Sequence, residues 1–170
     1  MSSRGSHPCA VSVLDVPPAD FVPDDFDVPT ELVCEGFRLT RLGPEHNIAD
    51  HAAWTSSIEH IRATPGFAGE KWPVPMTLEA NLDDLRRHRD DFERRRGFTY
   101  TVLDEHGDVI GCVYIYPSHQ PTAGADVASW VCAARRPLDR PLWHAVSNWL
   151  ESSWPFTDVR YAPRGDDGEP

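Results

Sequence analysis

The fold is decided by three consecutive segments, FTYTVL (98–103), DEHG (104–107) and DVIGCVYIY (108–116). The first and the third segments are rich in β-branched and aromatic residues, which favour β-strands. The middle segment has turn composition and ends in glycine, which adopts a left-handed backbone conformation without strain. The sequence therefore predicts an antiparallel β-hairpin over 98–116.

Downstream of this hairpin the pattern predicts a strand, a helix and a second strand. Residues 126–132 read as a strand, and a helix begins at Asp139 and is closed by Pro155. A short strand follows over 158–161. Such a β-α-β unit predicts parallel strands with a right-handed crossover. The helix residues that we expect to face inward are Leu142, Ala145, Val146, Trp149 and Leu150.

Upstream of the hairpin lie one strand and two helices. Residues 37–42 alternate apolar and polar, which is typical of a half-buried strand. One helix is predicted over 45–62, and a second over 78–96, after Thr77 as its N-cap. The order is then β-α-α-β-β-β-α-β, which predicts an α/β (α+β) fold with a mixed, mostly antiparallel central sheet flanked by helices. The first helix is expected to turn inward Ile48, Ala52, Ile58 and Ile61.

The chain divides into an arm, one domain and a tail. Its 170 residues suit a single domain, which we place at 36–162. Residues 1–35 carry five prolines and an acidic cluster, so they cannot form a long helix and are expected to lie extended over the domain or to be disordered in part. Residues 163–170 form a polar tail. Because a bare sheet edge invites pairing, we expect this arm, or the partner subunit of a homodimer, to cover it.

Composition and charge exclude several classes of protein. The formal net charge is −11, and the arginines of 86–96 alternate with acidic residues, so we expect no nucleic-acid partner. The four cysteines form no C-x-x-C pair, which argues against a zinc site, and we expect no metal. No apolar window approaches about 20 residues and no signal peptide is evident, so we expect no membrane partner and a cytoplasmic location.

The order of elements, together with five segments, resembles the GCN5-related N-acetyltransferase family over about residues 37–161. The segments are FTYTVLD (98–104), HGDVIG (106–111), CVYIYP (112–117), ADVASWV (125–131) and LDRPLWHAVSNWL (138–150). In that family the strand before the last long helix parts from its parallel neighbour, and acyl-CoA enters the gap. The resemblance implies an N-acyltransferase that moves an acetyl group from acetyl-CoA, as co-substrate, to a small-molecule or protein amine.

The resemblance also assigns the cofactor site. The parting strand would be 129–132, and the pyrophosphate would lie on the loop 133–140, where main-chain amides and the start of a helix favour an anion. The cofactor-binding residues implied in this way are Trp130, Val131, Cys132, Arg135, Arg136, Leu138 and Arg140.

The sequence departs from the family in two ways. The loop 133–141 has no glycine, and Pro137 and Pro141 each lack an amide that could bind phosphate. The family continues after the last strand with a helix that often supplies a tyrosine acid, whereas this sequence stops soon after that strand, so Tyr161 is given no such role. A second reading is therefore a catalytically silent domain of the same fold that acts through protein contacts. A hydrolase is disfavoured, because no G-x-S-x-G sequence is present.

Candidate catalytic residues come from the first helix and from the hairpin. Glu59 and His60 lie where the family forms the wall of its acceptor site, although neighbouring helical residues point about 100° apart. The alternative is that both are surface residues. Tyr114 shares a strand face with Tyr116 and either lines the acceptor cleft or packs at its rim. The loop 64–76, rich in glycine, proline and tryptophan, either gates a cleft or connects two helices rigidly.

Overall fold

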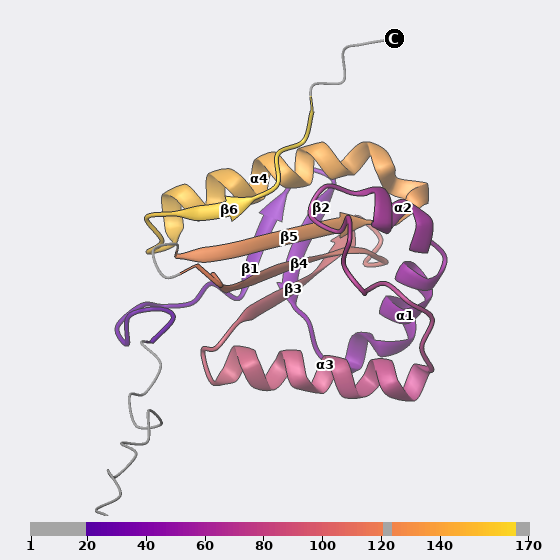
Figure 1. The fold of residues 1–170 in the computed structure, drawn as a ribbon, viewed down its shortest axis with the longest axis horizontal. Helices are drawn as coiled ribbons and strands as arrows, with labels where there is room; N and C mark the ends of the chain where they lie inside the picture. The colour runs from indigo at the N-terminus through magenta and orange to yellow at the C-terminus, as the bar shows by residue number, and fades with distance from the viewer. Residues whose placement is uncertain (1–19, 121–123, 166–170) are drawn as a thin grey trace, which may run out of the picture.

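The computed structural model describes residues 20–120 and 124–165. Six strands form one sheet whose spatial order equals their order in the sequence (Figure 1). Neighbouring strands are antiparallel except for the last two, which run parallel. The strands are β1 (Glu31–Cys34), β2 (Phe37–Arg41), β3 (Phe98–Asp104), β4 (Val109–Pro117), β5 (Ala125–Val131) and β6 (Val159–Tyr161). The predicted mixed, mostly antiparallel sheet flanked by helices is confirmed.

The predicted hairpin is formed by β3 and β4, which are the central strands of the sheet. Gly107 adopts a φ of +83° in the turn, and Asp104 accepts hydrogen bonds from the amides of His106 and Asp108. Every residue of β3 is buried, because helices or loops cover both faces of the sheet here. In β4, a side chain on Gly111 would begin only 2.3 Å from the carbonyl oxygen of Trp130, so a glycine lets β5 approach.

In the part of the chain that the structure describes, four α-helices cover the two faces of the sheet. Helix α4 (Asp139–Ser153) lies on one face, and α1 (Asn47–Thr55), α2 (Ile58–Ala63) and α3 (Leu78–Glu93) lie toward the other (Figure 1). Thr77 caps α3 as predicted, since its side chain accepts a hydrogen bond from the amide of Ala80. None of the helices in 20–120 and 124–165 is long and apolar enough to cross a membrane.

Two apolar clusters correspond to these two layers. The larger one joins α4 to β2–β5 and includes Phe98, Val113, Val146 and Trp149. It contains four of the five helix residues that were expected to face inward, namely Leu142, Val146, Trp149 and Leu150, and the fifth, Ala145, packs against it half-buried. The smaller cluster joins α1–α3 to β4 and β5 through Leu42, Ala53, Trp54, Ile61, Phe67, Leu85, Cys112 and Trp130.

The N-terminal half differs from the prediction in three respects. Residues 31–34 form the edge strand β1, paired with β2, and the part of the arm before residue 20 lies outside the described residues. The single helix predicted over 45–62 is divided into a short 3-10 turn, α1 and α2. The break lies at Ser56 and Ser57, where Ser57 leaves the helical conformation and its hydroxyl accepts the amide of Ala133. Ile48 and Ala52 do not face inward, because both are exposed, Ile48 by 75%.

Candidate functional site

Strands β5 and β6 pair over a short segment only, because β6 is three residues long. Their pairing runs from Ala125 opposite Val159 to Val127 opposite Tyr161. Beyond it, residues 128–131 of β5 continue in register with β4 only, so that their outer edge is not covered by β6. All three residues of β6 are paired and β6 ends at Tyr161, so β5 keeps an uncovered edge at 128–131, where the family resemblance implied that the strands part; this end of the pairing is called the divergence.

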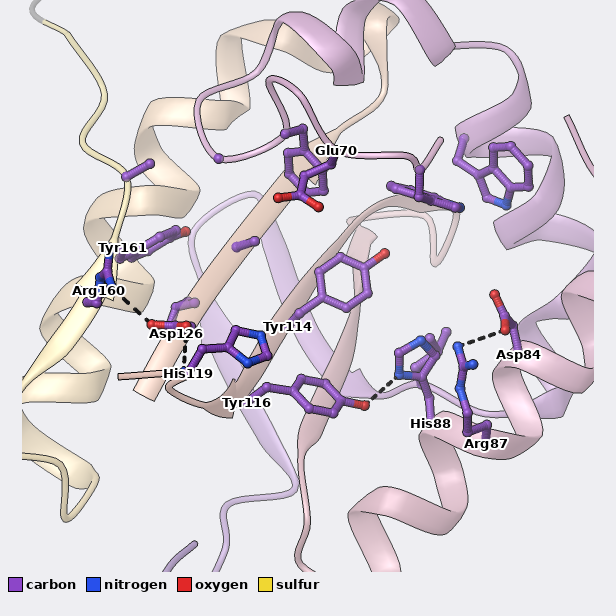
Figure 2. A pocket seen from close by; sticks show the side chains of 18 of the residues that line it. Glu70, Asp84, Arg87, His88, Tyr114, Tyr116, His119, Asp126, Arg160 and Tyr161 are labelled. Carbon is purple, nitrogen blue, oxygen red and sulfur yellow. Dashed lines mark hydrogen bonds and ion pairs between the residues drawn. The ribbon is translucent and has the colours of Figure 1, made fainter. Parts of the chain in front are cut away.

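A cavity of about 1220 Å³ lies beside this divergence, on the face of the sheet that carries α1–α3. Its walls come from α1, α3, the loop 64–76 and the strands β4, β5 and β6 (Figure 2). Val127, Ala128 and Tyr161, which flank the divergence, belong to the lining. A ligand that entered between β5 and β6 would therefore reach this cavity.

Aromatic rings form the apolar wall of the cavity. Trp72 occupies the middle of this wall, with ring centroids 5.5 Å from Trp54, 5.9 Å from Phe67, 6.4 Å from Tyr114 and 6.2 Å from Trp130. The rings come from a helix, a loop and two strands, so the wall joins segments that are distant in the sequence. The loop 64–76 thus supplies part of the cavity through Phe67 and Trp72.

A buried polar network closes the inner end of the cavity between α1 and α3. The amide nitrogen of Asn81 donates to Asp50 Oδ2 at 3.1 Å and to Asn47 Oδ1 at 2.9 Å. Asn81 Oδ1 accepts from Trp54 Nε1 at 3.0 Å. Burial raises the pKa of Asp50 to about 6, against the opposing effect of the hydrogen bond from Asn81. Asp50 therefore titrates near neutral pH.

A second network surrounds His88 of α3, which also lines the cavity. Its Nδ1 lies 2.9 Å from the hydroxyl of Tyr116 (Figure 2). The hydroxyl of Thr99 lies at the same distance from Nδ1, and Tyr116 donates to Asp91 Oδ2 at 3.0 Å. Burial lowers the pKa of His88 to about 4, so its imidazole is neutral at neutral pH. A pKa this low makes the imidazole a weak proton acceptor, so its part in the network is that of a neutral hydrogen-bond partner.

Charged residues line the mouth of the cavity, and most of them are paired. Asp84 pairs with Arg87 at 2.7 Å, and Asp126 lies 3.9 Å from Arg160. The carboxylate of Glu70 points toward the cavity (Figure 2), and within the described residues it forms no ion pair. The side chains of the described residues gather no group of three histidines, cysteines or carboxylates that could hold a metal ion.

Arg164 bridges the divergence between the two strands. Only 4% of its side chain is exposed. Its Nη2 donates to the carbonyl oxygen of Ser129 at 2.9 Å, and its Nε donates to Asp139 Oδ2 at 2.7 Å. Further bonds reach the carbonyl oxygens of Pro65 and Ala162. The guanidinium thus joins the outer edge of β5 to the first turn of α4.

The structure places the predicted cofactor residues along this region in different environments. Trp130 and Val131 are buried in the core, and the amide of Cys132 donates to the carbonyl of Ile110 at 2.8 Å. Residues 133–138 form a 3-10 helix in place of an open loop, and the amide of Ala133 is held by Ser57 at 2.8 Å. Some of the groups expected to meet a phosphate are therefore already bonded within the chain.

The three arginines that were predicted to bind the cofactor differ in how far their side chains are already bonded within the chain. Arg135 forms an ion pair with Asp104 at 2.5 Å, which ties the loop to the central hairpin. Arg136 is exposed, and among the described residues the one hydrogen-bond partner of its Nε is the carbonyl of Ala133, at 3.2 Å. Arg140 is half-buried in the first turn of α4, next to Asp139, and Leu138 is half-buried where that helix begins. The charge most accessible to an anion in this loop belongs to Arg136.

Of the predicted catalytic residues, the structure brings one to the cavity. Tyr114 lines it, and its hydroxyl accepts from Trp130 Nε1 at 3.0 Å; burial raises the pKa of Tyr114 far above its ordinary value. Glu59 is exposed and pairs with Arg62 at 3.4 Å. His60 is half-buried, and neither residue belongs to the lining.

The residues that sequence reasoning missed are Asp50, His88 and Arg164, whereas Trp72 belongs to the loop 64–76 that was expected either to gate a cleft or to connect two helices rigidly. Two signals were present in part: Asn81 and His88 fall on the same helical stripe as Leu85 and Phe92, where polar residues are unexpected. Polar side chains on a buried stripe point to a network or a site. No local signal marks Arg164, because its partners lie 25 and 35 positions earlier in the chain.

Comparison with known proteins identifies solved structures that are similar in fold to this chain. No family model and no curated protein matches the sequence significantly. A putative ribosomal-protein-serine acetyltransferase from Vibrio cholerae matches with a TM-score of 0.61 and 11% identity, over 81% of this chain and 75% of that protein. The ribosomal-protein-S5-alanine acetyltransferase from Vibrio fischeri matches with a TM-score of 0.55 and 14% identity, over 73% and 67% of the two chains.

A third match adds a ligand. The Microcin C7 self-immunity acetyltransferase, solved with acetyl-CoA and AMP, has a TM-score of 0.55 and 11% identity, over 73% of this chain and 66% of that protein. At such identities the matches establish the fold and no more. The resemblance predicted from the hairpin and from the β-α-β unit is confirmed at this level: the chain has the fold of the GCN5-related N-acetyltransferases, and it is a divergent example of that fold.

Proposed function

We propose that the chain is an N-acetyltransferase that transfers the acetyl group of acetyl-CoA to an amine. The observation that carries the proposal is the divergence of β5 and β6 beside a cavity of about 1220 Å³. In this proposal the thioester lies along the uncovered edge of β5 and the amine occupies the cavity, so that the two substrates meet beside the divergence. Solved acetyltransferases of the same fold, one of them with acetyl-CoA, support it.

In this proposal the pantetheine arm lies along the uncovered edge of β5, at 128–131, where main-chain groups can pair with its amides as an added strand would. The diphosphate lies at 133–140, close to the exposed guanidinium of Arg136 and to the start of α4. The acetyl group then points through the divergence into the cavity, beside Ala128 and Tyr114.

The residues of the cavity suit the chemistry. A neutral amine nitrogen attacks the thioester carbonyl, and the thiolate of CoA leaves. The strongly raised pKa of Tyr114 keeps its hydroxyl protonated, so it is a proton donor and not a base. We assign the Tyr114 hydroxyl as a hydrogen-bond donor to the carbonyl oxygen of the thioester or as a proton donor to the departing sulfur. The cytoplasm, where acetyl-CoA is available and thiols stay reduced, is the location that fits this activity.

Binding of the co-substrate is the first test. Acetyl-CoA at 100 times its dissociation constant is expected to raise the free energy of unfolding by about 2.7 kcal/mol, because it binds only the folded chain. Thermal unfolding with and without acetyl-CoA measures this. No shift at millimolar acetyl-CoA would contradict the proposal and would leave the silent domain as the better reading.

The position of the diphosphate is tested by reversing one charge. Arg136→Glu is expected to weaken acetyl-CoA binding about tenfold or more, since it removes one charge-assisted contact and adds a repulsion. Calorimetric titration measures the two affinities. Arg38→Glu, an equal change at an exposed position of β2, is the matched control and is expected to bind as the unmodified chain does. Equal affinities for both variants would refute this placement.

A further inference from the structure

Asp50 is a buried carboxylate that lacks a cation. It is 4% exposed and lines the inner end of the cavity. Its Oδ2 accepts the amide of Asn81, and its Oδ1 has no hydrogen-bond partner within the described residues. The other carboxylates of the cavity wall from α3 and β5, Asp84 and Asp126, each have an arginine. A buried carboxylate without a partner is costly, so the site is short of one positive charge.

The groups that face Asp50 do not supply this charge. On α1 the charge of the neighbouring His51 lowers the pKa of Asp50, but His51 Nε2 lies 2.8 Å from the carbonyl oxygen of Met76, and within the described residues His51 forms no ion pair with Asp50. The carboxylate of Asp84 on α3 adds a like charge. On β4, Cys112 and Tyr114 interact electrostatically with Asp50, and burial raises the pKa of both well above the ordinary values, which keeps them uncharged. No side chain of the described residues forms an ion pair with Asp50, so a cationic ligand would be its first ion-pair partner.

Beside Asp50 the cavity wall is aromatic. Trp54 is buried under the cavity, with its ring 5.5 Å from that of Trp72, and Phe67 and Tyr114 extend the same wall. Such rings bind apolar groups, and their faces attract a cation near them. A cavity of about 1220 Å³ has room for a body of at least the size of an aromatic ring next to the acetyl group.

We propose that the inner end of the cavity is the acceptor subsite, and that it takes a primary amine carried on an apolar, ring-sized body, with the nitrogen on Asp50 and the body against Trp54 and Trp72. The inference rests on the proposed transferase function and names its class of acceptor.

The reaction balances with these groups. The amine arrives as an ammonium ion, and Asp50 takes one of its protons and later releases it to solvent. The neutral nitrogen forms the bond to the acetyl carbon, and the carbon–sulfur bond breaks. A second proton from the nitrogen reaches the thiolate, so that the amide, CoA as its thiol and one released proton are the products.

The probe for this subsite is phenethylamine, titrated in the absence of acetyl-CoA and followed by calorimetry and by tryptophan fluorescence at pH 7.5. Saturable binding in the millimolar range or tighter is expected. Asp50→Asn is expected to weaken it at least tenfold, because the ammonium loses its counter-charge. Asp83→Asn, which removes a carboxylate from the exposed face of α3, is the matched control and is expected to bind normally. Binding of equal strength to Asp50→Asn overturns the proposal.

A second comparison uses the unmodified chain and does not depend on how a variant folds. Phenethyl alcohol has the same ring without the charge and is expected to bind at least tenfold more weakly than phenethylamine, whereas equal affinities overturn the proposal. Affinity for the amine is also expected to fall as the pH drops below about 6, where Asp50 becomes protonated.

Titrations of acetyl-CoA into the unmodified chain and into Asp50→Asn separate the claim of an acceptor subsite from the claim of transferase function. Normal acetyl-CoA binding without amine binding by the unmodified chain refutes the acceptor subsite alone. Amine binding without any acetyl-CoA binding refutes the transferase proposal and leaves an amine-binding site at Asp50.

Discussion

Replacing Arg164 by alanine is expected to lower the free energy of unfolding by about 3 kcal/mol and to raise the affinity for acetyl-CoA about tenfold. The loss of stability follows from its buried bonds. The guanidinium donates to Ser129, Asp139, Pro65 and Ala162, and its removal leaves a partly buried carboxylate and a strand edge without a partner. Removing one partner of a buried pair costs several kcal/mol, and the partial exposure of Asp139 reduces that figure.

The gain in affinity for acetyl-CoA is expected because Arg164 occupies a position that the cofactor needs. Arg164 holds the carbonyl of Ser129, which belongs to the β5 edge that the pantetheine arm would occupy. A cofactor that needs this edge binds only the molecules in which Arg164 has withdrawn, and the measured affinity falls by the fraction that has done so. Without the arginine this loss disappears.

Chemical denaturation and calorimetric titration measure the two effects of Arg164→Ala. The same truncation at Arg160, an exposed residue of β6 whose carboxylate neighbour is 3.9 Å away, is the control for stability and should change it by less than about 0.5 kcal/mol. Should Arg164→Ala bind acetyl-CoA no better than the unmodified chain, or more weakly, Arg164 does not obstruct the cofactor path.

Asp50→Asn is expected to stabilise the fold by about 3 kcal/mol at neutral pH. In the folded chain burial raises the pKa of Asp50 to about 6, above its ordinary value of 3.8. The folded state therefore holds a proton that the unfolded state has released between these two pH values. Stability from this group is fully present below about pH 4 and is lost as the pH rises through about 6. An asparagine stays neutral and can still accept the bond from Asn81.

The comparison of the two chains across pH isolates this effect from all other titrating groups. The difference in the free energy of unfolding, variant minus unmodified chain, should be small at pH 4 and should reach about 3 kcal/mol above pH 6, which corresponds to about 8 °C in the unfolding temperature. Urea unfolding at pH 4, 5, 6 and 7.5 measures it. A difference that does not vary with pH would show that Asp50 is not a buried, unpaired carboxylate.

The fold was accessible from the sequence because its signals are local and periodic. Strands β3 and β4 are close in sequence, joined by a turn that needs Gly107 at positive φ. Helix α4 keeps Leu142, Val146 and Trp149 on one face, so its burial follows from spacing alone.

The candidate site was harder to predict from the sequence, because it buries polar residues and exposes a hydrophobic one. Reasoning from hydrophobicity turned Ile48 inward, whereas α1 buries Asn47 and Asp50. Asn81, a partner more than 30 positions away, donates to both of these residues, although it reaches only one oxygen of Asp50. Arg164 was missed for the same reason: its role depends on tertiary pairing with Ser129 and Asp139.

Hydrogen exchange with and without saturating acetyl-CoA tests most directly whether the cofactor binds between β5 and β6. We predict slower exchange in peptides covering 128–140 and 159–164, since a pantetheine arm on the β5 edge and a diphosphate at α4 would protect those amides. Unchanged exchange in both segments at a concentration that saturates binding would contradict a cofactor site in the divergence.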